Sequence, residues 1–258
     1  DGQGPLYLMG VFDGHGKYGH EVSDIATNRL PGHISSQEVH PSTDPKKALQ
    51  DAFQKMDDDI FAKMGSQVEY SGSTGVVVLL DHGKRLLTTA NVGDSRAVIG
   101  QKSADARSPR WSAVALTADL KPELPEERER IELTGGTVAQ FKDDRTGEEC
   151  GPFRVWDGPG LEKPGLAVSR SLGDGAARDL GVIAEPVVTS HKLRPEDQFL
   201  LIATDGLWDS VSNEEAVRIV AKFIHMPKVA LKALTETVRR IEGNELVDDT
   251  TMLLVVFN

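Results

Sequence analysis

Apolar and polar positions along the chain follow two periods, one typical of strands and one typical of helices. Apolar runs bounded by turn-forming residues predict strands at 6–12, 75–80, 85–91, 95–99, 187–190, 198–204 and 250–257. Apolar residues at helical spacing predict helices at 19–30, 45–64, 122–133, 213–223 and 228–240, with Asp44 as the N-cap of the second. Short turns join the three strands between residues 75 and 99, so we expect an antiparallel meander there.

The order of these elements bears on the fold class. Strands outnumber helices and do not alternate with them regularly, which argues against a doubly wound sheet or an α/β barrel. We therefore predict an α+β fold in which two antiparallel β-sheets form a central sandwich flanked by helices (α-β-β-α). No internal repeat is present, and residues 1–258 are interpreted as a single domain that is incomplete at its N-terminus, because residue 1 is Asp rather than Met. Segment 137–165 is rich in Gly and Pro without periodicity, so we interpret it as a mobile surface flap.

Charge and cysteine content narrow the possible partners and compartments. The chain has 29 basic and 40 acidic residues, a net charge of -11, which disfavours binding to nucleic acid or to an anionic membrane surface. No apolar run approaches the roughly 18 residues of a membrane span. The single cysteine, Cys150, excludes an internal disulfide and is consistent with a reducing compartment, the cytoplasm or the nucleus.

Four turns share one design, in which an apolar strand delivers an aspartate into a corner rich in Gly or Thr. They lie at 11–16, 91–95, 202–209 and 247–251, and they carry Asp13, Asp94, Asp205, Asp209 and Asp248. Each turn alone is more simply a structural turn, because Asp-Gly is a common turn signal. Together they suggest a site, since strand-end loops commonly hold functional groups and carboxylate oxygens suit Mg²⁺ or Mn²⁺. Two carboxylates about 4 Å apart repel by about 4 kcal/mol at an effective dielectric near 20, so a converging set requires cations.

Four further motifs follow the same order as those of a known family. They are SGSTG at 71–75, LTAD at 116–119, GLAVSRSLGD at 165–174 and IAEP at 183–186. With the four aspartate turns, they make the chain resemble the metal-dependent, type 2C class of serine/threonine protein phosphatases over nearly its whole length.

The resemblance implies a site built around two divalent ions, Mg²⁺ or Mn²⁺. Asp13 matches the ligand that bridges the two ions, and the Gly14 carbonyl matches a ligand of one of them. Asp205 and Asp248 match ligands of the other ion. A metal pair of this kind orients a phosphomonoester and lowers the pKa of a bound water that attacks it.

Other positions of the resemblance concern a third ion and the leaving group. Asp94 and Asp209 match residues associated with a third, more loosely held metal. His15 matches the residue that protonates the leaving oxygen, a role that suits the pKa of imidazole. Asp174 and Arg170 are interpreted as a pair with a structural or substrate-side role.

The chain also departs from the family pattern. The family places a phosphate-binding Arg and a metal-binding Glu on a strand before the first motif, and nothing precedes Asp1 here. We expect the parent protein to supply both residues. Asp249 stands where the family more often has Asn, and it either supports Asp248 or has no role.

The implied activity is hydrolysis of phosphoserine and phosphothreonine in protein substrates. The sequence does not indicate the oligomeric state, so a monomer is the default expectation. One alternative is a pseudophosphatase, an interaction module that keeps the fold and binds partners. Another is a metal phosphoesterase acting on small molecules or nucleic acid. The presence of Asp13, His15, Asp205 and Asp248 favours an enzyme, because a binding module gains nothing from a costly cluster of carboxylates.

Overall fold

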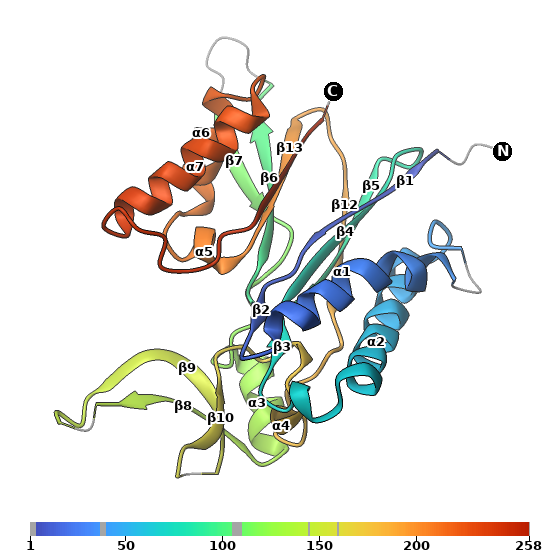
Figure 1. Ribbon diagram of the computed structural model, residues 1–258. Helices are drawn as coiled ribbons and strands as arrows, with labels where there is room; N and C mark the ends of the chain where they lie inside the picture. Colours follow the sequence, from blue (N-terminus) through green and yellow to red (C-terminus); the bar gives the residue numbers. More distant parts are fainter. Residues whose placement is uncertain (1–3, 37–39, 105–109, 144, 159, 258) are drawn as a thin grey trace.

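Two four-stranded antiparallel sheets, stacked face to face, form the centre of the molecule (Figure 1). The computed structural model describes residues 4–36, 40–104, 110–143, 145–158 and 160–257. The first sheet has the order β1 (Leu6–Val11), β4 (Gly75–Asp81), β5 (Leu86–Val92), β12 (Val187–Lys192). The second has the order β14 (Met252–Val256), β13 (Asp197–Ala203), β6 (Arg96–Lys102), β7 (Trp111–Ala115).

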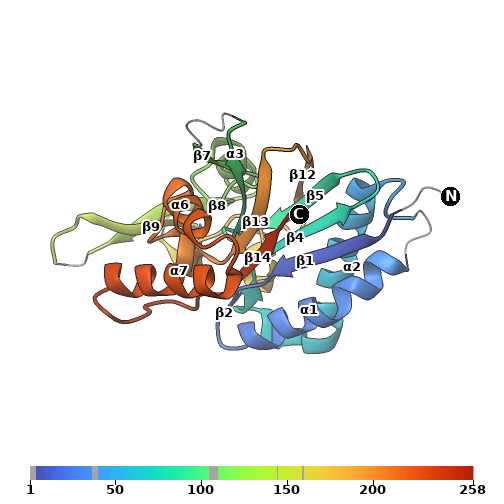
Figure 2. The ribbon, with the colours of Figure 1, turned by 90° about the horizontal axis from the view of Figure 1, so that it is seen from above.

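Helices cover the outer faces of both sheets. The first sheet carries α1 (Gly19–Ser35) and α2 (Pro45–Met64), and the second carries α6 (Asn213–Lys222) and α7 (Pro227–Ile241). Seen from above, the two helix pairs lie on opposite sides of the stacked sheets (Figure 2). The predicted α-β-β-α sandwich is therefore confirmed.

Three apolar layers hold this arrangement together. Phe53 of α2 lies in the layer between the first helix pair and its sheet, Ile99 lies between the two sheets, and Leu234 of α7 lies under the second helix pair. All three side chains are buried. Because both faces of strand β4 are covered, its residues are buried throughout, and its sequence is a continuous apolar run instead of an alternating one.

The first two helices show where local sequence rules hold and where packing overrides them. The side chain of Asp44 accepts a hydrogen bond from the Lys47 backbone N–H at 3.0 Å, as expected of an N-cap. The predicted end of α1 at Leu30 is wrong, because the helix continues through Pro31 to Ser35. A proline inside a helix loses one backbone hydrogen bond, but Leu30 and Ile34 are both buried in the core, and this burial keeps the last turn helical.

The predicted meander is also wrong. Strands β4 and β5 do pair, but β6 leaves for the other sheet and pairs with β13 and β7. Gly93 forms the corner between β5 and β6 with φ +83°, and a Cβ there would lie 2.7 Å from the side chain of Thr74. This corner places Asp94 where the two sheets meet.

Segment 137–165, interpreted from sequence as a flap, contains regular structure. It holds a sheet of β8 (Gly136–Lys142), β9 (Glu149–Asp157) and β10 (Glu162–Leu166), following α3 (Pro125–Leu133), whose predicted start at 122 was too early. Register shifts in both strand pairs interrupt the alternation that would have revealed the strands. In Figure 1, β8 and β9 extend away from the sandwich, and their predicted mobility stays a prediction.

Several short elements complete the described chain. β2 (Gly14–His15), β3 (Gly72–Ser73) and β11 (Leu172–Gly173) form a small antiparallel sheet, and η1 (Gly65–Val68), α4 (Gly175–Arg178) and α5 (Asp205–Trp208) are single turns of helix. None of the helices in the described ranges combines the length and apolar character needed to cross a bilayer.

Candidate active site

The ends of strands from both sheets bring four aspartates to one cavity. Asp13 follows β1, Asp94 lies in the corner between β5 and β6, Asp205 follows β13, and Asp248 lies in the loop before β14. All four line a cavity of about 450 Å³, and so do Gly14 and His15. Residues nearly 240 positions apart in the chain thus meet at one place.

Asp209 occupies a different position from the other candidate ligands. It caps the C-terminal end of α5 and is exposed, and it is not among the described residues that line the cavity. The pKa of Asp209 is nevertheless raised. Desolvation of its carboxyl group is the largest cause; the charge of Lys121 opposes the shift, and the charge of Asp94 adds to it. Asp209 is therefore close enough to interact electrostatically with the cavity.

Burial and, after it, the charges of neighbouring aspartates set the electrostatics of the cavity. Burial raises the pKa of Asp13 to about 6; a hydrogen bond with Asp205 opposes this shift, and the charges of Asp248 and Asp94 add to it. Burial and then the charges of Asp94, Asp13 and Asp248 raise the pKa of Asp205 to about 8. Without positive charge, Asp205 therefore stays largely protonated at neutral pH, and Asp13 loses its proton at a higher pH than an ordinary aspartic acid does.

The donor set fits hydrated divalent cations. Carboxylate and carbonyl oxygens are the preferred ligands of hard cations, and Asp13, the Gly14 carbonyl, Asp205 and Asp248 could provide them. In the described part of the chain, no three His, Cys, Asp or Glu side chains already surround a single point as the ligands of one ion would. Mg²⁺ keeps several of its waters and takes only one or two carboxylates, so this spread is compatible with a pair of hydrated ions.

Two basic side chains, Lys121 and Arg96, form ion pairs with aspartates at or near the cavity. Lys121 Nζ lies 2.6 Å from Asp94 Oδ2, and the Asp94 side chain is only 6% exposed. Arg96 donates two hydrogen bonds, of 2.8 and 2.5 Å, to the carboxylate of Asp119, and these contacts hold the loop after β7 in place. The motif at 116–119 contained Asp119, but sequence reasoning missed Lys121 because ion-pair partners have no local signature.

His15 is held by a buried carboxylate. Its Nε2 lies 2.7 Å from Oδ2 of Asp174, whose side chain is 5% exposed. Burial alone would lower the pKa of His15, but the charge and hydrogen bond of Asp174 outweigh it and raise that pKa. Asp174 has φ +53°, a left-handed backbone conformation that non-glycine residues adopt rarely and that Asp and Asn tolerate best.

This contact corrects the expected pairing of Asp174 with Arg170. Asp174 binds His15, whereas Arg170 binds Glu127 and the carbonyl of Glu185. The motif at 165–174 indicated that this segment is important, but it did not indicate which residues Asp174 and Arg170 contact.

Comparisons with known proteins agree with this geometry. The family model described as Protein phosphatase 2C matches residues 1–246. The chain belongs to the protein phosphatase 2C family. It is 38% identical to probable protein phosphatase 2C 48 of Oryza sativa subsp. japonica (97% of this chain and 75% of the relative), and 37% identical to probable protein phosphatase 2C 72 of Arabidopsis thaliana (95% and 75%). A crystal structure of serine-threonine phosphatase 2C from Toxoplasma gondii superposes with a TM-score of 0.77 at 25% identity, covering 98% of this chain and 85% of that one.

Membership in the family settles the class of enzyme. Protein phosphatase 2C enzymes are metal-dependent serine/threonine phosphatases, so this chain is a protein phosphatase that acts on phosphorylated proteins. None of these matches supports a pseudophosphatase.

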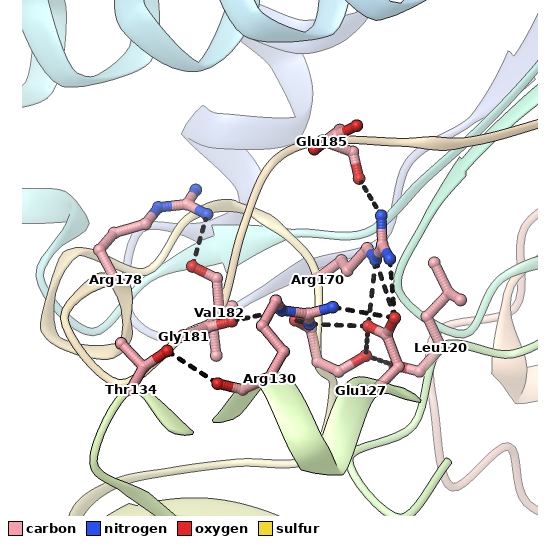
Figure 3. A network of polar contacts seen from close by, with 10 residues as sticks. Leu120, Glu127, Arg130, Thr134, Arg170, Arg178, Gly181, Val182 and Glu185 are labelled. Atoms are coloured by element: carbon pink, nitrogen blue, oxygen red, sulfur yellow. Dashed lines mark hydrogen bonds and ion pairs between the residues drawn. The ribbon is translucent and has the colours of Figure 1, made fainter. Parts of the chain in front are cut away.

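A second polar cluster of this phosphatase 2C domain is centred on Glu127 (Figure 3). Glu127 of α3 is 3% exposed and accepts hydrogen bonds from Arg130, Arg170 and Ser169. Burial alone would raise the pKa of Glu127, but these hydrogen bonds outweigh it and lower the pKa to about 2. The cluster connects α3 to Ser169 and Arg170, which directly follow the cavity-lining residues 166–168.

Proposed function

We propose that the phosphatase hydrolyses phosphoserine and phosphothreonine with two Mg²⁺ or Mn²⁺ ions held by Asp13, the Gly14 carbonyl, Asp205 and Asp248. The observation that carries this proposal is the gathering of carboxyl groups in one cavity, where burial and neighbouring charges raise the pKa values of Asp13 and Asp205 to about 6 and about 8. Divalent cations, when bound, neutralise such carboxylates, attract the phosphate dianion and supply an activated water.

The protein's own contribution to the chemistry centres on His15. Its contact with Asp174 uses Nε2, which leaves Nδ1 for the substrate side. Asp174 raises the pKa of His15, which favours the protonated form of the ring. An imidazolium there would donate its proton to the departing Ser or Thr oxygen, a poor leaving group, at a gain of about 10²- to 10⁴-fold.

The proposal includes a third, weaker cation between Asp94 and Asp209. Asp94 is already neutralised by Lys121, so an incoming ion would have to displace or share the ammonium group. We expect this competition to make the third ion more loosely held than the other two.

A metal-dependence assay with a ligand variant tests the two-ion proposal. We expect EDTA to abolish turnover of a phosphothreonine peptide and Mn²⁺ to restore it. Asp205→Asn should lower kcat/KM by more than about 100-fold, since even a lost hydrogen-bond partner of a ligand costs about 10- to 100-fold. Asp179→Asn removes the same charge from an exposed position and should leave turnover near wild type. Chelator-insensitive turnover would contradict the two-ion site.

The substrate class, assembly state and compartment complete the proposal. We propose a monomer that acts on phosphoproteins in the cytoplasm or nucleus, a reducing environment that suits the exposed free thiol of Cys150. Comparing turnover of a phosphothreonine peptide, a nucleotide and a cyclic phosphodiester would expose a small-molecule or nucleic-acid phosphoesterase. Light scattering after gel filtration measures the assembly state, and a dimer mass would contradict the monomer.

A further inference from the structure

Arg154 of β9 brings positive charge to a cavity whose other charged residues are mainly aspartates. It lines the same cavity as Asp13 and Asp205. Its Nη1 donates a hydrogen bond of 2.7 Å to the Gly165 carbonyl, and its guanidinium carbon lies 5.3 Å from the ring centre of Phe141. The side chain is thus fixed from two sides.

Among the described residues, the Gly165 carbonyl is the one hydrogen-bond acceptor of the Arg154 side chain. Its Nε is buried without a hydrogen-bond partner, and within the described residues no carboxylate pairs with the guanidinium. Buried polar atoms are nearly always hydrogen-bonded, and buried charges are nearly always paired. An arginine that is half-buried and unpaired beside a cavity is therefore suited to an anion that arrives with the substrate.

Arg154 reaches the cavity from β9, whereas Asp13 and Asp205 follow β1 and β13 of the central sandwich. A phosphoryl group held at those aspartates would therefore leave Arg154 for another part of the same substrate.

The rim beside Arg154 carries a second cation. Lys163 Nζ lies 5.2 Å from the ring centre of Tyr70, and Tyr70 lines the cavity while remaining 51% exposed. Lys163 itself is exposed, and its neighbour Pro164 lines the cavity. The side of the cavity formed by β9, β10 and Tyr70 is therefore cationic and aromatic, unlike the aspartate-lined wall at the strand ends.

We propose that Arg154, with Lys163 at the rim, binds an anionic group next to the phosphorylated residue of the substrate, either a carboxylate or a second phosphate. This inference rests on the proposed phosphoprotein activity and names the kind of sequence that the enzyme prefers. The planar guanidinium suits both groups, because it donates two parallel hydrogen bonds to paired oxygens. Arg154 is thus a specificity-determining residue.

Three phosphothreonine peptides that differ only in the flanking residue test the proposal. The flanking residue is Gln, Glu or phosphoserine in a phosphonate form that cannot be hydrolysed, and kcat/KM is measured with Mn²⁺ for the wild type and each variant. We expect the wild type to prefer a charged flank over Gln by about 10-fold, the scale of one hydrogen-bonded charge pair. A stronger preference for Glu identifies a carboxylate as the ligand, and a stronger preference for phosphoserine identifies a second phosphate.

Variants of Arg154 and Lys163 separate the effect of positive charge from the effect of the guanidinium geometry. In Arg154→Gln, the ratio of kcat/KM between the peptide with a charged flank and the peptide with Gln should fall close to one. The change should come from a higher KM for the charged peptide. Arg154→Lys should keep part of the preference, because the charge stays while the paired geometry is lost. Lys163→Gln should weaken the preference for a charged flank less than Arg154→Gln does. Arg239→Gln, in an exposed part of α7, is the matched control and should keep the wild-type preference.

The outcomes distinguish this inference from the proposed function. If the wild type hydrolyses all three peptides equally well, or if Arg154→Gln keeps the full preference, the inference is overturned. If the wild type hydrolyses none of them with Mn²⁺, the proposed function fails instead. Should Arg154→Gln lose its cooperative thermal transition, the exposed Lys163→Gln variant and the wild-type preference still decide the question.

Discussion

Replacing Asp174 with Asn would test how the enzyme positions His15, its proposed proton donor. The change keeps the shape of the side chain and removes the charge that faces His15 Nε2 at 2.7 Å. Shape matters at this position, because a Cβ at the neighbouring Gly72 would lie only 2.2 Å from Asp174 Oδ2, which shows how closely the carboxyl group is packed. An asparagine fits the same space, so we expect the variant to fold.

The size of the effect follows from the contact that is lost. A hydrogen bond to a charged partner contributes about 1.5–3 kcal/mol. If that energy keeps the ring protonated and correctly oriented in the transition state, its loss lowers kcat by about 10- to 100-fold, since about 1.4 kcal/mol corresponds to tenfold in rate.

Leaving-group dependence distinguishes this role from a purely structural one. A phosphothreonine peptide needs a proton on its departing oxygen, whereas p-nitrophenyl phosphate releases a stable aryl oxide and depends on that proton much less. We therefore expect Asp174→Asn to lose far more activity on the peptide than on the aryl ester. Asp179→Asn, an exposed charge change in the same segment, should lose little on either substrate. An equal loss on both substrates would refute the role of Asp174 in positioning the acid.

Two further predictions concern stability. Glu127 has a pKa lowered from 4.5 to about 2, so its stabilisation is complete above pH 4.5 and is lost as the pH falls toward 2. Urea unfolding should show Glu127→Gln to be less stable by about 3 kcal/mol at neutral pH, with the difference shrinking below pH 4.5; a constant difference would contradict this. Asp13 and Asp205 have raised pKa values, about 6 and about 8, so the metal-free fold binds more protons than the unfolded chain and loses stability as the pH rises toward 8. Thermal unfolding should therefore show more stabilisation by Mn²⁺ at pH 8 than at pH 5, reaching about 2.7 kcal/mol when Mn²⁺ is at 100 times its dissociation constant; equal stabilisation at both pH values would be inconsistent with those carboxyl groups as ligands.

Much of the fold could be predicted because its strands and helices carry their own local signals. The apolar run of β4 and the Asp44 cap of α2 are examples, and each depends on residues close together in sequence. The aspartates were predictable for the same reason, because each follows an apolar strand at a turn. That Asp13 and Asp205 would meet was inferred from a family resemblance and not from either turn alone.

The features that the sequence did not reveal all depend on contacts between distant residues. His15 and Asp174 are 159 positions apart, and neither has a local pattern that indicates the other. The crossing of β6 to the second sheet depends on the conformation of Gly93 and on strand pairing that alternation cannot report. The strands β8 to β10 were hidden by register shifts.

The division of the aspartates between two sheets makes the catalytic geometry sensitive to the layer in the middle of the sandwich. Asp13 follows the first sheet and Asp205 follows the second, so their separation changes whenever one sheet slides over the other. Hydrophobic contact between the sheets opposes separation but has no preferred direction, so alignment depends on how side chains such as Val78 and Ile99 interlock. Trimming Ile99 to Val would cost only about 0.5–1.5 kcal/mol of stability. A screen for inactive but folded variants should therefore find some of them in this layer, far from any residue that touches substrate.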